Sequence, residues 1–142
     1  ECNMNLSAFL NPVKQENIKF AASRKFVGQD GKPALWEIKA IATDEDEEIR
    51  KSCTKKVSVP GKYGQFTMET DYDLYLGKLA AACTVEPNLN DEKLQDAYKV
   101  MGSDKLLKKM LRPGEYALYL KKVQEINGFD TTVEETAEQA KN

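Results

Sequence analysis

A chain of 142 residues is long enough to form one domain whose hydrophobic core needs neither disulfides nor bound metals. Its 41% apolar and 31% charged residues are typical of a globular protein, and a net charge of −2 gives little long-range attraction for nucleic acid. No apolar run approaches the roughly 18 residues that a membrane-spanning helix needs, and the first residues lack a secretory signal pattern. Three widely separated cysteines fit a reducing compartment. We therefore expect a cytoplasmic protein that binds neither membrane nor nucleic acid.

The N-terminal third predicts a short weakly ordered segment followed by a β-hairpin. Residues 1–15 hold few apolar side chains, and Asn11-Pro12 should end any helix early. Between residues 17 and 41 the apolar positions alternate, and the Gly28–Pro33 link is rich in turn residues, which predicts two paired strands. A lone hairpin is marginal in water, so its apolar face should cover helices or meet another subunit, and self-association through this hairpin is one expectation.

The middle of the chain predicts two helices and an irregular connection. Thr43 should cap a helix that runs to about Thr54, with Asp46 completing a capping box. The segment from Val57 to Met68 is interrupted by two glycine turns, which fits either a second hairpin or a loop, and a loop with strand character at its ends is favoured. Thr70 should open the central helix over residues 71–85. This helix is apolar on two sides, which is typical of a helix buried between layers.

Residues 89–130 predict three short amphipathic helices. Asn90 should cap the first and Gly102 should end it, Ser103 should cap the second, and Pro113 and Gly128 should bound the third. The resulting fold class is α+β, a mainly α-helical single domain over residues 16–129 with an N-terminal β-hairpin. Residues 130–142 are expected to form an acidic flexible tail.

The search for chemistry yields no catalytic, cofactor or metal site. The chain has no histidine, its cysteines lack metal-ligand spacing, and no glycine-rich phosphate motif occurs. The acidic run from Asp44 to Glu48 and the pair Asp71 and Asp73 lie at predicted helix starts, where carboxylates complement the helix dipole. We expect a protein that is not an enzyme and that binds no cofactor.

One position remains a candidate for partner binding. Leu118 falls among Lys121 and Lys122 on the polar side of the third C-terminal helix, where the core pattern does not require a leucine. Isolated exposed leucines are common, so a solvated surface and a partner contact both stay open. The basic stripe Lys105, Lys108, Lys109 and Arg112 lacks interleaved aromatic residues and favours a solvated helix face over a phosphate-binding track.

Several segments of the chain, in their order and spacing, resemble those of one known protein family. These segments are LNDEKLQDAY, VMG, LLKKML, PGEY and VQEINGFD, preceded by KFVGQDGKPALWEIKAI, IRKSCTKKV and GKYGQF. Together they are similar to the XkdN-like phage tail assembly chaperones over about residues 5–130. The resemblance implies a non-enzymatic prophage protein of the host cytoplasm. Its implied partner is the tape-measure protein, kept soluble while tail tube protein is recruited around it.

Two alternatives accompany this expectation. A structural tail subunit or head-tail connector subunit would belong to the same structural class but would persist in mature particles. A small regulatory nucleic-acid-binding protein would depend on the basic stripe alone, and its binding would weaken steeply with salt.

Overall fold

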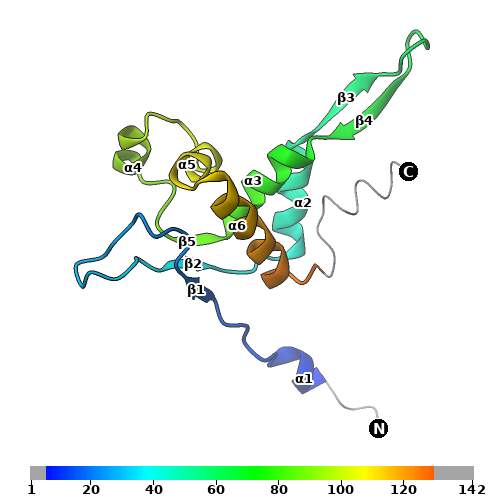
Figure 1. Ribbon diagram of the computed structural model, residues 1–142. Helices are drawn as coiled ribbons and strands as arrows, with labels where there is room; N and C mark the ends of the chain where they lie inside the picture. Colours follow the sequence, from blue (N-terminus) through cyan, green and yellow to red (C-terminus); the bar gives the residue numbers. More distant parts are fainter. Residues whose placement is uncertain (1–5, 130–142) are drawn as a thin grey trace.

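The computed structural model describes residues 6–129 and has an α+β fold in which helices pack around a central helix, α3 (Figure 1). The helices are α1 (Leu6–Leu10), α2 (Thr43–Ser52), α3 (Tyr72–Cys83), α4 (Glu92–Ala97), α5 (Ser103–Met110) and α6 (Pro113–Ile126). The strands are β1 (Ile18–Phe20), β2 (Trp36–Ile38), β3 (Thr54–Ser58), β4 (Phe66–Thr70) and β5 (Thr84–Glu86). The predicted fold class is confirmed.

The N-terminal hairpin forms as the alternating pattern predicts. Strands β1 and β2 pair antiparallel, with Ile18 opposite Ile38 and Phe20 opposite Trp36. The sequence did not predict β5, which pairs antiparallel with the other edge of β2 to complete a three-stranded sheet. The side chains of Trp36 and Ile38 are buried against the helices, so the β2 part of the hairpin's apolar face is covered within the chain, whereas Ile18 of β1 is 37% exposed.

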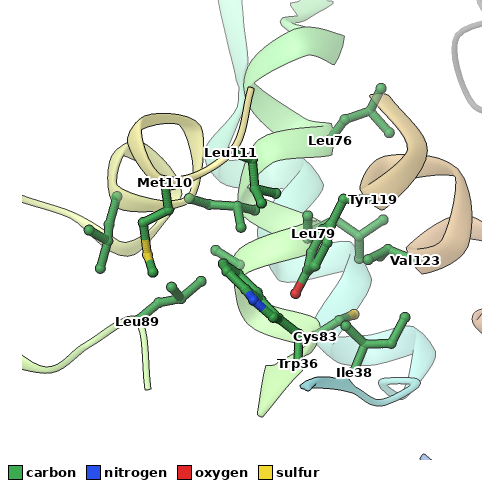
Figure 2. Packing of buried hydrophobic residues seen from close by; sticks show 14 of the residues in the cluster. Trp36, Ile38, Leu76, Leu79, Cys83, Leu89, Met110, Leu111, Tyr119 and Val123 are labelled. Carbon is green, nitrogen blue, oxygen red and sulfur yellow. The ribbon is translucent and has the colours of Figure 1, made fainter. Parts of the chain in front are cut away.

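The core centres on α3, as its two apolar sides predict. Helices α2, α5 and α6 all pack against it, and β2 adds side chains to the same cluster (Figure 2). Tyr119 of α6 is completely buried, and its ring centroid lies 5.6 Å from those of both Trp36 and Phe20. Its hydroxyl is hydrogen-bonded to Thr84 Oγ1. Tyr119 therefore joins α6, the sheet and the end of α3.

Two predicted helix starts are displaced by one residue. Helix α3 is capped by Asp71, whose Oδ1 accepts a hydrogen bond from the Leu74 N–H at 3.1 Å, and Thr70 instead ends β4. Helix α2 has Ala42 at its N-cap and ends at Ser52, so Thr43 is its first helical residue. Asp46 does not complete a capping box, because its carboxylate accepts a hydrogen bond from the Tyr75 hydroxyl.

Residues 57–68 belong to a second hairpin rather than to the favoured loop, although the strand character expected at both ends of the segment is present. Strands β3 and β4 form an antiparallel hairpin in continuous register from Thr54 opposite Thr70 to Ser58 opposite Phe66. This hairpin projects away from the helical body (Figure 1). Apolar patterning could not reveal it, because both of its faces are largely exposed to solvent.

The C-terminal helices exist as predicted, but two boundaries differ. Helix α4 is capped by Asp91 rather than by Asn90, and it ends at Ala97 rather than at Gly102. Gly102 is the N-cap of α5, with φ of +117°, so Ser103 is the first helical residue rather than the cap. The limits of α6 at Pro113 and Gly128 are confirmed.

Residues 1–5 and 130–142 lie outside the described residues, and with them the predicted acidic flexible tail. The short helix α1 ends at Leu10, directly before the Asn11-Pro12 pair that was expected to end any helix there. Among the described residues, no helix combines the length and the apolar character that crossing a bilayer requires.

Candidate protein-binding surface

The outer face of α6 carries the residues that the sequence singled out. Leu118 is 64% exposed, and Lys121 and Lys122 lie one turn further along the same face and are exposed. The ammonium of Lys122 lies 5.1 Å from the centroid of the Phe20 ring in β1. We define Leu118, Lys121, Lys122 and Phe20 as the α6 surface. It combines an exposed apolar side chain with two cations, a composition that suits a partner bearing both apolar and acidic groups.

The start of α6 is fixed by polar contacts that hold this surface in place. The Arg112 N–H donates to Glu115 Oε1 at 2.9 Å, and the Arg112 guanidinium lies 3.2 Å from Glu115 Oε2. The hydrogen bond from the Arg112 backbone is the main reason that the pKa of Glu115 lies below its usual range. Glu115 is therefore a helix-capping group.

A groove that the sequence did not predict lies between α2 and α3. Its volume is about 550 Å³, and its lining includes small or apolar side chains from α2, α3 and β5. These are Ile49, Ser52, Ala81, Ala82 and Val85. Lysines and acids, Lys39, Lys78, Glu48 and Asp104, also line it. The second apolar side of α3 was the available signal, since Ala81 and Val85 belong to that side.

Burial and neighbouring side chains explain the shifted pKa values of the ionisable groups inside the fold. Burial is the main reason that the pKa of the Cys83 thiol is raised, and the Asn127 amide that lies 3.4 Å from its sulfur only opposes this effect. A protonated buried thiol is a poor nucleophile. Burial and the neighbouring Asp46 carboxylate raise the pKa of Tyr75. Within residues 6–129, no group of three or more acidic or cysteine side chains is placed to hold a metal ion.

Comparison with known protein families identifies the family of this chain. The sequence profile of the phage XkdN-like tail assembly chaperone proteins matches residues 6–141. The chain belongs to the XkdN-like tail assembly chaperone family. The family match therefore gives this protein a role related to phage tail assembly.

Two proteins of Bacillus subtilis strain 168 show how far this XkdN-like chain resembles other sequences. XkdN of the phage-like element PBSX is 32% identical over 141 residues, which cover 97% of this chain and 94% of XkdN. The uncharacterized protein YqbN is 34% identical over 141 residues, which cover 97% of this chain and 93% of YqbN. The crystal structure of YqbN has a TM-score of 0.75 at 31% identity and covers 89% of this chain and 98% of that structure.

Proposed function

We propose that this protein is a non-catalytic chaperone of the host cytoplasm that binds a phage tape-measure protein and assists assembly of the tail tube around it. The observation that carries the proposal is the family match over residues 6–141. Helical clients expose apolar stripes along one face, and such stripes are covered by grooves or by apolar patches with charged borders. The α6 surface and the α2–α3 groove are two candidates for this contact.

The α6 surface is the first candidate, and Leu118→Asp tests it. The substitution removes the exposed apolar contact and places a carboxylate beside Lys121 and Lys122. We expect co-purification with the tape-measure protein to fall strongly. The free energy of unfolding should change by no more than about 0.5 kcal/mol, because surface substitutions rarely exceed that value. Pull-down and thermal melting of the same preparations measure both quantities.

Ala117→Asp is the matched control, because Ala117 is an exposed neighbour on α6 and the change adds the same charge without removing Leu118. This control should bind as the unchanged protein does. Undiminished binding by Leu118→Asp would remove the α6 surface from the proposal. Loss of binding by Ala82→Arg in the same assay would then assign the contact to the α2–α3 groove, where Ala82 is exposed.

The proposal also separates a chaperone from a structural subunit of the virion. A chaperone acts during assembly, so mass spectrometry should detect the protein in lysates that are assembling tails and not in purified particles. A stoichiometric amount in purified particles would favour the tail or head-tail connector subunit instead.

A further inference from the structure

The β3–β4 hairpin is an arm with little support from the rest of the fold. At its base, Thr54 Oγ1 donates to the Arg50 carbonyl at 2.8 Å, and the Asp71 N–H donates to the Cys53 carbonyl at 2.8 Å. Beyond that base the arm extends from the helical body (Figure 1). Isolated two-stranded hairpins are marginal in water, and this one exposes Phe66 by 54% and Met68 by 64%. These features suit an arm that is completed by another strand.

The hydrogen-bonding pattern shows which backbone groups are available along β4. The Val59 N–H donates to the Gln65 carbonyl at 3.0 Å, and the Asp71 N–H donates to the Cys53 carbonyl. In an antiparallel ladder such inward-facing residues alternate with outward-facing ones. The N–H and C=O groups of Phe66, Met68 and Thr70 therefore point away from β3. Within residues 6–129 this hairpin contains two strands only, so the outer edge of β4 has no strand partner there.

The two outer edges of the hairpin differ in charge. Strand β3 carries exposed Lys55 and Lys56, and lysines on an edge strand oppose pairing with another copy of that edge. Strand β4, with the sequence Phe-Thr-Met-Glu-Thr, carries no cation. Phe66 and Met68 lie two residues apart and therefore share one face of the strand. The edge of β4 is thus the one suited to pairing.

We propose that two copies of this chain associate by antiparallel pairing of their β4 strands, giving a four-stranded sheet across a twofold axis. A register centred on Met68 uses the whole of β4 and places Phe66 of each copy opposite Thr70 of the other. The outward-facing N–H and C=O groups of Met68 in one copy then form hydrogen bonds with those of Met68 in the other copy. The exposed Phe66 and Met68 side chains of both copies adjoin on one face of the sheet.

Charge complementarity supports a second copy as the occupant. Lys62 lies in the turn at the tip of the arm, where its carbonyl accepts a hydrogen bond from the Gln65 N–H at 3.1 Å. The exposed acids Asp71 and Asp73 lie at the opposite end of β4, in the cap and first turn of α3. Antiparallel pairing brings the tip of each arm to the base of the other. Lys62 of each copy therefore approaches the Asp71 and Asp73 side chains of its partner, and the twofold symmetry makes both contacts.

Sedimentation velocity of the full chain with Met68→Pro tests the pairing. Proline at this position removes the outward N–H on the proposed axis while leaving the ladder to β3 intact, because Met68 faces away from β3. We expect the unchanged protein to form dimers and Met68→Pro to dissociate at least about tenfold more readily, since two symmetric backbone hydrogen bonds are lost. Ser58→Pro is the matched control, because Ser58 lies opposite Phe66 and its N–H faces the outer edge of β3. It should remain dimeric.

A second pair of variants keeps every backbone donor. Met68→Lys places two cations face to face on the axis and should give monomers, whereas Ser58→Lys adds the same charge to β3 and should not. Similar thermal melting temperatures of the four variants and the unchanged protein, measured at concentrations low enough for all of them to be monomeric, establish that the helical body stays folded. A monomeric unchanged protein at all concentrations would overturn the proposal. Dimers of both Met68 variants would also overturn it, as would monomers of both β3 controls.

Discussion

Replacing Tyr119 by alanine is expected to lower the free energy of unfolding by about 3–5 kcal/mol, the cost of deleting a buried aromatic ring. Tyr119 is completely buried and packs against Trp36 edge to face, with an interplanar angle of 74°. Removing it leaves a cavity where α6 meets the sheet and the end of α3. Denaturant unfolding followed by the single tryptophan, Trp36, measures the loss at the site of the change.

Tyr119→Phe is the control that separates the ring from the hydroxyl. It keeps the ring and removes only the hydrogen bond to Thr84, whose hydroxyl still donates to the Ala80 carbonyl at 2.8 Å. We expect a loss of about 1 kcal/mol, the net value of one such bond. A Tyr119→Ala loss that equals the Tyr119→Phe loss would contradict the role assigned to the aromatic packing.

Leu79→Ala is expected to cost on the order of 2–5 kcal/mol through lost transfer energy and an unfilled cavity. Leu79 is 1% exposed and lies on α3, where it joins the cluster shared by the helices and β2 (Figure 2). Urea unfolding of the variant measures the effect. Leu118→Ala is the same chemical change on the surface and should stay within about 0.5 kcal/mol. Similar losses for the two variants would show that α3 is not the centre of the core.

The sequence predicted correctly those elements that are bounded by characteristic residues or that have one buried and one solvated face. Pro113 and Gly128 bound α6 as expected, and the alternation before Ile41 gave the N-terminal hairpin. Helix α5, expected to be amphipathic, buries Leu106, Leu107 and Met110. In each case the backbone preference of one residue type, or the contrast between a buried and a solvated face, agrees with the final packing.

The predicted helix caps failed where tertiary contacts used the same side chains. Thr70 could not cap α3 because its hydroxyl lies 2.7 Å from that of Thr54 across the β3–β4 ladder, and Asp71 caps instead. Asp46 is bound to Tyr75, a residue distant in sequence. The Gly102 N–H donates to Gln95 Oε1 at 3.1 Å, which positions Gly102 before α5. Such contacts form only when the chain folds, so the sequence alone does not reveal them.

Of the candidate surfaces, the sequence predicted one and missed the other two. The helical phase of α6 predicted the exposure of Leu118, whereas its role in binding stays a prediction. The α2–α3 groove depends on how two helices and β5 meet, which only the folded chain shows. The β3–β4 arm lacks an apolar pattern because neither of its faces is buried, so the alternation that identifies half-buried strands is missing.

Co-purification of the unmodified protein with the tape-measure protein of its own phage tests the proposed function most directly. The two chains are expressed together, with an affinity tag on the XkdN-like chain, and the soluble fraction is analysed. We predict that the tape-measure protein is recovered with the tagged chain and that it becomes insoluble when this chain is omitted. A tape-measure protein that is equally soluble without this chain, and absent from the purified material, would contradict the account.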